Sequence, residues 1–256
     1  MTTWLFDLGN SRLKFAPLLP DGSVGEAYAQ AHDGLVLDPA WTQRLPAHIE
    51  AADAANVAHS PVRTALLEAL ARRATRISFA ATLRHCAGVR IAYAHPRKLG
   101  VDRFLAMLGA HARQARPWLV VGVGTALTID LLDAQGQHHG GRIGPSPTLM
   151  RQALHQRAVQ LPQAGGRYLP FATDTEDALA SGCLGAALGL VEHSLRAAES
   201  VVRQPLQILL HGGGAEAMRP LLPDAEHAPS LVLEGLARWS HFVDGTDTAV
   251  PSGGRP

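Results

Sequence analysis

Residues 4–15 read WLFDLGNSRLKF and residues 118–132 read WLVVGVGTALTIDLL, and the two stretches share one design. Each begins as an apolar run typical of a buried strand, passes through a turn of glycine and small polar residues, and returns as a second strand. A further turn signal follows in each half, at residues 20–23 and 133–137. Repetition at this separation does not fit a solenoid, so we expect two related half-domains.

The remaining apolar patterns place further elements around these hairpins. They predict helices near 61–73 and 103–115, from Thr148 and over 174–200, and strands near 54–58, 89–93 and 206–211. Asp174 or Thr175 would cap the long helix. The order predicts two α/β lobes facing a nucleotide cleft. We expect the lobes at residues 1–116 and 117–243, and a disordered tail at 244–256.

The composition excludes several classes of protein. The net charge is +1, and no segment approaches the roughly 20 apolar residues that a membrane span needs. No secretory signal is visible at the N-terminus, so we expect a cytoplasmic protein.

Cys86 and Cys183 have no partner at metal-ligand spacing and are expected to be reduced core thiols. Adjacent His138 and His139 would point to opposite faces of a strand, and we expect them to face solvent.

A short basic stretch is the one sign of contact with nucleic acid. It consists of Arg72, Arg73, Arg76 and Arg84. Because the chain as a whole is neutral and has no DNA-binding motif, a solvated helix face explains these arginines better.

The turn of the first hairpin is a candidate phosphate site. Gly9 and the small residues beside it allow backbone amides to converge on a phosphate. Asp7 ends an apolar strand, where a carboxylate needs a partner such as Mg²⁺ or water, and Lys14 could add a positive charge. An ordinary hairpin turn with a solvated Asp7 explains the same residues about as well.

Two further clusters carry candidate chemistry. The turn Gly122-Val-Gly-Thr125 would hold phosphates in the second half. Asp102 and Arg103 open a helix, where Asp102 could take a proton from an attacking hydroxyl and Arg103 could hold an anionic group. Asp102 is also in a good position for simple helix capping.

Taken in order, these motifs resemble the type III pantothenate kinase family, also called the Bvg accessory factor family. The resemblance runs to about residue 240 and rests on DLGNSRLK from Asp7, LGVDR from Leu99, GTALTID from Gly124 and GGRIGP from Gly140, with weaker support from TEDALASG at Thr175 and HGGG at His211. It implies a duplicated actin/hexokinase-like (ribonuclease H-like) two-lobed fold. It also implies a homodimer that phosphorylates pantothenate with ATP and Mg²⁺, the first step towards coenzyme A.

The resemblance also assigns roles to residues. Asp102 would be the general base. The ATP and magnesium site would comprise Asp7, Gly9, Asn10, Ser11, Lys14 and Thr125. The pantothenate pocket would comprise Tyr93, Gly100, Val101, Arg103 and Thr175, with Arg103 facing the carboxylate and Thr175 acting across the dimer interface.

The sequence departs from the family pattern at Gly122. Members of the family usually carry Asp there, associated with a monovalent cation such as K⁺ or NH₄⁺. Glycine offers no side-chain oxygen, so we expect this cation site to be weakened or lost. Two alternatives follow: an active kinase that depends less on the cation, or an impaired relative that binds nucleotide or pantothenate and acts as an accessory protein.

Overall fold

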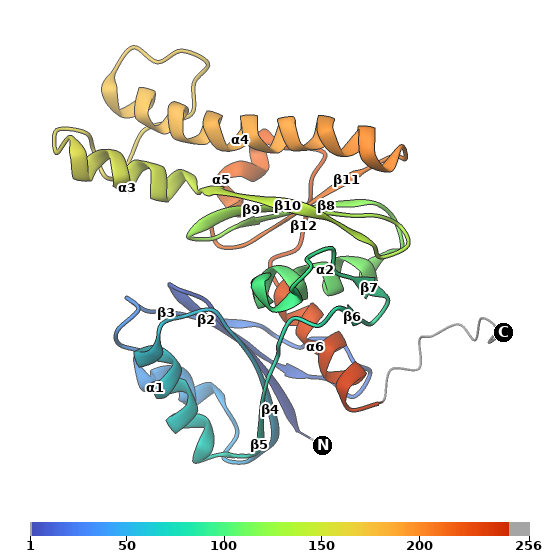
Figure 1. Cartoon of the computed structure of the whole chain (residues 1–256). Coiled ribbons are helices and arrows are strands. Elements are labelled where there is room, and N and C mark those ends of the chain that lie inside the picture. Colours follow the sequence, from blue (N-terminus) through green and yellow to red (C-terminus); the bar gives the residue numbers. More distant parts are fainter. Residues whose placement is uncertain (1, 246–256) are drawn as a thin grey trace. The chain divides into compact units, whose positions relative to one another are not determined.

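Two compact units make up the chain (Figure 1), whose structure is a computed structural model that describes residues 2–245. Unit 1 contains the described residues up to Ala115, residues 135–138 and those from Ser230 onward. Unit 2 contains residues 116–134 and 139–229.

Unit 1 is built on a five-stranded sheet with the order β3-β2-β1-β4-β5. Its strands are β1 (Thr3–Leu8), β2 (Arg12–Leu18), β3 (Tyr28–Ala31), β4 (Ile49–Asn56) and β5 (Ala74–Phe79). β1 pairs antiparallel with β2 and parallel with β4. The first hairpin is therefore the one that the sequence predicts, and β1 lies at the centre of the sheet.

Helices contribute to unit 1 from distant parts of the chain. α1 (Ser60–Ala71) and the 3-10 helix η1 (Pro39–Arg44) add Leu66 and Trp41 to an aromatic core around Phe6 and Phe15. α2 (Val101–Arg113) packs against α6 (Leu231–Val243), and both helices contact strands of the same sheet. The smaller elements of this unit are β6 (His85–Cys86), β7 (Val89–Arg90) and η2 (Pro96–Lys98).

Unit 2 repeats the same sheet. The order is β10-β9-β8-β11-β12, which is the order of unit 1 with each strand replaced by its counterpart. The strands are β8 (Trp118–Val123), β9 (Ala126–Leu132), β10 (His138–Pro145), β11 (Gln207–His211) and β12 (Glu226–His227). β8 pairs antiparallel with β9 and parallel with β11, as β1 does with β2 and β4. This internal repeat is the duplicated actin/hexokinase-like fold, in agreement with the sequence.

The long helix α4 (Thr175–Val202) lies along one face of this second sheet, and α3 (Pro147–Arg157) packs against α4 (Figure 1). The short α5 (Ala215–Met218) and η3 (Arg219–Leu221) follow further along the chain. Asp174 is the cap of α4, since its carboxylate accepts from the Asp177 amide at 2.9 Å. Within residues 2–245, α4 alone is long and apolar enough to cross a membrane by length and composition, and it contacts α3, β8 and β9.

Several expectations meet different outcomes. Cys86 and Cys183 are buried free thiols, as predicted. His138 is buried, so its expected solvent exposure is wrong, while the neighbouring His139 does face outward at the other side of β10. The contacts of α6 group it with unit 1, whereas the sequence places residues 117–243 in one lobe. Most of the tail predicted to be disordered, residues 246–256, lies outside the described residues.

Candidate functional site

The first glycine turn joins β1 to β2 and is braced by the chain that follows β3. The Gly9 amide donates to the Arg12 carbonyl at 3.0 Å, which closes the turn. The His32 ring nitrogen Nε2 lies 3.0 Å from the Gly9 carbonyl, and the His32 amide donates to the Ser11 carbonyl. Within residues 2–245, the amides of Asn10 and Ser11 donate to no protein acceptor, and both residues are exposed. These two amides can therefore serve an anionic ligand, while that of Gly9 is used by the turn.

A carboxylate and an ammonium group stand side by side next to this turn. Asp7 and Lys14 are directly opposite each other in the β1–β2 pair. Burial raises the pKa of Asp7 to about 7; nearby Lys14 opposes that rise, and Asp102 adds to it. Burial also lowers the pKa of Lys14, against the attraction of Asp7. Asp7 and Asp102 are thus close enough to repel each other, which is the condition under which a carboxylate pair attracts a cation.

Asp102 owes its position to a glycine. The N-cap of α2 is Gly100, Val101 is its first residue, and Asp102 follows in the first turn. A Cβ on Gly100 would lie 2.6 Å from Oδ1 of Asp102, so only glycine leaves the carboxylate this place. The N-cap residue Gly100 makes no side-chain capping hydrogen bond, and Asp102 is the acid of the first turn, where the helix dipole favours a negative charge.

Arg103, on the same helix, forms a small buried cluster with two aromatic rings. Its Nη1 donates to the Tyr93 hydroxyl at 3.4 Å. The Tyr93 ring stacks on that of His138 with centroids 5.9 Å apart, and the Ala92 amide donates to Nδ1 of His138 at 3.5 Å. Buried His138 thus supports the ring of Tyr93. Local sequence patterns do not reveal this role, because the two rings belong to residues 45 apart in the chain.

The second glycine turn, in unit 2, is also closed by its glycine amide, but onto a carbonyl two residues further along instead of three. The Gly124 amide donates to the Ala126 carbonyl at 2.9 Å, and Gly124 and Thr125 are exposed. The loop after β11 lies against this turn, since the Gly214 amide donates to the Val123 carbonyl at 2.9 Å. Gly212 has a φ of +95°, and a Cβ there would meet the same carbonyl. The HGGG segment and the Gly122–Thr125 turn therefore form one glycine-rich surface.

Gly122 does not leave an empty place in β8. A Cβ on Gly122 would lie 2.7 Å from Oγ1 of Thr128 and 2.8 Å from Nε2 of His211. Both residues are the register partners of Gly122 on the neighbouring strands. The imidazole and the hydroxyl thus occupy the space into which a side chain at residue 122 would project.

The predicted residues are divided between the two units. Unit 1 brings together Asp7, Lys14, Asp102, Arg103 and Tyr93, while unit 2 carries Gly122, Thr125 and Thr175. Thr175 is exposed at the first position of α4.

A metal ion would find a limited set of protein ligands here. Among residues 2–245, no group of three or more His, Cys, Asp or Glu side chains could hold a metal ion. The neighbouring Asp7 and Asp102 nevertheless fit Mg²⁺, which commonly binds to one or two carboxylates together with substrate phosphates.

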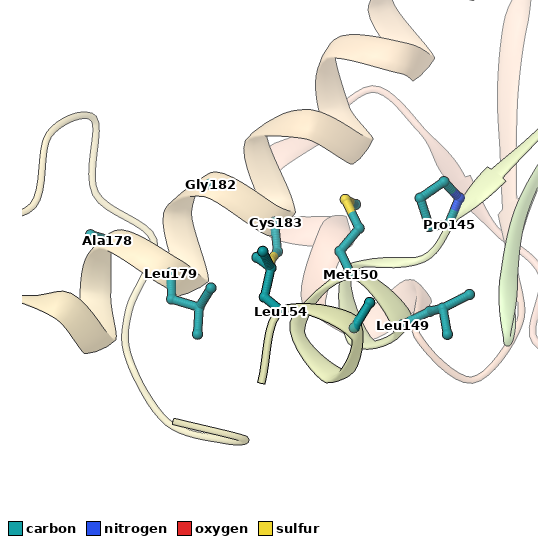
Figure 2. A pocket seen from close by; sticks show the side chains of 9 residues that line it. Pro145, Leu149, Met150, Leu154, Ala178, Leu179, Gly182 and Cys183 are labelled. Atoms are coloured by element: carbon teal, nitrogen blue, oxygen red, sulfur yellow. The ribbon is translucent and has the colours of Figure 1, made fainter. Parts of the chain in front are cut away.

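An apolar groove of about 760 Å³ runs between α3 and the start of α4 (Figure 2). Leu149, Met150 and Leu154 line it from α3, facing Leu179 and Cys183 of α4. Leu149 and Leu154 are 37% and 45% exposed. None of the predicted site residues lines this groove.

The basic stretch is only partly solvated. Arg76 forms a two-point ion pair with Asp244 at 2.9 and 3.0 Å, and Arg84 donates to the Ala94 carbonyl at 2.7 Å. Two of the four arginines are thus engaged with the protein itself, which does not favour a nucleic-acid surface.

Known proteins resemble this chain in sequence and in fold. The family described as "Type III pantothenate kinase" matches residues 4–197. The type III pantothenate kinase of Stenotrophomonas maltophilia (strain K279a) is 57% identical over 94% of this chain and 98% of its own. A proposed Baf family transcriptional activator from Campylobacter jejuni has a TM-score of 0.60 at 16% identity over 94% and 98% of the two chains. A proposed 2-dehydro-3-deoxygalactonokinase from Sinorhizobium meliloti has a TM-score of 0.55 at 15% identity over 94% and 99%. These two structures bear on the fold alone.

Proposed function

Because the chain belongs to the type III pantothenate kinase family, we propose that it transfers the γ-phosphoryl group of ATP to pantothenate and forms 4′-phosphopantothenate. This reaction is the first step of coenzyme A biosynthesis. The observation that carries the proposal is that Asp102, in the first turn of α2, lies close enough to Asp7, near the end of β1, for its charge to raise the pKa of Asp7. An acid that can receive a proton thus lies beside an acid suited to a metal–phosphate complex.

The acceptor side is assigned to the start of α2. Asp102 takes the proton of the pantothenate hydroxyl as its oxygen attacks the γ-phosphorus, and ADP leaves. Arg103 holds the pantothenate carboxylate, with the Tyr93 hydroxyl at its Nη1. Gly100 and Val101 line the pocket with backbone, and Thr175 completes it.

The nucleotide side is assigned to the glycine turns. The amides of Asn10 and Ser11, the turn at Gly9 and the Lys14 ammonium bind phosphate oxygens, and Thr125 is also assigned to nucleotide binding. Asp7 holds Mg²⁺, which would neutralise charge on the phosphates. Positioning and charge neutralisation supply most of the acceleration in phosphoryl transfer, so these turns matter as much as the base.

We also propose that the protein is a cytoplasmic homodimer. The apolar groove between α3 and α4 supports a second copy as its occupant, since its exposed leucines would otherwise remain in water. Thr175 begins the helix that forms one wall of this groove.

A coupled assay of ADP release, with ATP and Mg²⁺ and with or without pantothenate and K⁺, tests the reaction. ADP release that depends on pantothenate, with 4′-phosphopantothenate identified by mass spectrometry, is the expected result. ADP release that is the same without pantothenate would contradict the proposal. Thermal stabilisation by pantothenate without turnover would favour an accessory protein.

A further inference from the structure

We propose that His211 is a nucleotide-binding residue whose Nε2–H donates a hydrogen bond to a phosphate oxygen of ATP, an inference that rests on the proposed kinase function. The strand pairing places this residue beside the second glycine turn. β11 runs parallel to β8, and His211, its last residue, is the register partner of Gly122. The imidazole therefore lies at the carboxyl ends of two parallel strands, where open α/β sheets bind their ligands.

The absence of a side chain at residue 122 directs the imidazole. Nε2 of His211 lies 2.8 Å from the point that a Cβ on Gly122 would occupy, so any other residue would push the ring away. On the opposite side, Oγ1 of Thr128 lies 2.7 Å from the same point. Two polar groups thus converge over Gly122, although a core position in β8 would ordinarily be covered by apolar side chains.

The backbone around His211 is suited to a phosphate chain. The next three residues are glycines, and the amide of Gly214 ties their loop to Val123 at the end of β8. The exposed Gly124 and Thr125 follow directly after Val123. His211 is itself partly exposed rather than sealed in the core. A phosphate bound to this glycine surface would lie beside the strand that ends at His211, and hydrogen bonds to charged groups are among the stronger ones.

The test compares three variants with the wild type in steady-state kinetics. His211→Leu removes the donor, His211→Gln restores an N–H near the position of Nε2, and Gly122→Ala adds the methyl group that displaces the ring. The matched control is His193→Leu, because His193 is an exposed histidine on α4. Thermal unfolding of each protein, followed by circular dichroism, reports on folding.

We expect His211→Leu to raise KM for ATP by on the order of tenfold or more, and KM for pantothenate by less than about twofold. His211→Gln should recover most of the loss, and His193→Leu should behave as wild type. Gly122→Ala should also raise KM for ATP. The double variant His211→Leu/Gly122→Ala should have a KM for ATP no higher than that of the poorer single variant, because both substitutions remove the same contact.

Three outcomes would overturn the inference. They are an unchanged KM for ATP in His211→Leu, a parallel change in both KM values with a lowered Tm, and a His211→Gln variant as poor as His211→Leu. If His211→Leu fails to fold, ¹⁵N NMR of the wild-type protein replaces it. The imidazole resonance of His211 is assigned as the one that is missing from the spectrum of His211→Gln. This resonance must shift when the ATP analogue AMPPNP is added. An unmoved resonance in a protein that binds AMPPNP refutes the role of His211 alone. Wild-type protein that binds no AMPPNP refutes the proposed function as well.

Discussion

Asp102 and Gly100 act together at the start of α2, because the glycine leaves room for the carboxylate. The same pattern recurs in unit 2, where Gly122 leaves room for His211 and Thr128. In both places the proposed functional group belongs to one residue, and the space that it occupies is left by a neighbouring glycine. Replacing either member of such a pair should therefore affect the same chemistry.

Asp102→Asn tests the general base. The amide has nearly the same shape but accepts no proton, so kcat should fall by on the order of 10²–10⁴-fold while AMPPNP still binds. Quenched-flow or coupled kinetics measure the first quantity, and calorimetry measures the second. The control is Asp38→Asn, because Asp38 is exposed in unit 1, and this variant should retain full activity. Asp177→Asn is unsuitable as a control, because Asp177 is buried at the start of α4 and its replacement would test the structure of that helix. Retention of more than a tenth of wild-type kcat in Asp102→Asn would exclude this role.

The pKa of Asp7 predicts how stability without ligands depends on pH. Its pKa is about 7 in the folded protein and near 3.8 in the unfolded chain, so the folded state holds the proton over that interval. The contribution of Asp7 to stability is present below pH 3.8 and is lost as the pH rises through 7. Relative to Asp7→Asn, wild-type protein should therefore lose stability between about pH 4 and pH 7. Urea unfolding of both proteins across this interval measures the difference, and parallel curves would contradict the burial of Asp7.

At the scale of elements, α2 and α6 approach each other through glycines. A Cβ on Gly109 of α2 would lie 2.6 Å from the Leu231 carbonyl oxygen, and one on Gly235 of α6 would overlap the Leu105 carbonyl. The obstacles are backbone atoms, which cannot rotate away. Close packing of these helices therefore depends on two missing methyl groups.

Gly235→Ala should lower the free energy of unfolding by about 1–3 kcal/mol or more, because the methyl group forces the helices apart. The matched control is Gly189→Ala on α4, where a Cβ meets nothing within 4 Å. That control should gain roughly 0.5–1 kcal/mol from helix propensity. Chemical denaturation of both variants measures the two changes in the free energy of unfolding, which should have opposite signs. A Gly235→Ala protein as stable as the wild type would refute the tight α2–α6 contact.

How far the sequence predicts these elements depends on the range of the interactions. Both hairpins, α1 to α4 and the cap at Asp174 follow from local periodicity and turn chemistry, and they agree with the sequence. The helix α6 was missed although residues 231–243 carry a local amphipathic pattern, whereas its place in unit 1 and the burial of His138 depend on contacts with segments far away in the chain. At Gly122 the sequence indicates only a missing carboxylate. The pairing register of the strands is needed to show that His211 and Thr128 fill the space beside it.

At the scale of the whole molecule, each unit has its own sheet and core, and the apolar groove of unit 2 is the surface where we propose that a second copy binds. Leu154, 45% exposed on α3, lies in this groove. Its exposure is what a self-association surface requires, since the side chain is available without unfolding.

Leu154→Arg should convert the proposed dimer to a monomer, because the charge would be buried without a partner in the interface. Sedimentation velocity at micromolar concentration measures the change in mass. Leu35→Arg is the matched control, since Leu35 is 69% exposed in unit 1 and lies outside the groove. A wild-type protein that sediments as a monomer, or a Leu154→Arg protein that sediments as a dimer, would contradict this interface.

The position of α6 in unit 1 constrains how the protein can fold during translation. β1 leaves the ribosome well before α6, the helix that packs with α2 on its sheet and is encoded after residue 230. Unit 2 lies almost entirely between these two segments, so its residues are complete while unit 1 still lacks a helix. We therefore expect unit 2 to complete its fold before unit 1, whereas the N-terminal part of a nascent chain usually folds first. The β1–β2 hairpin must wait for α6 before its sheet is fully covered.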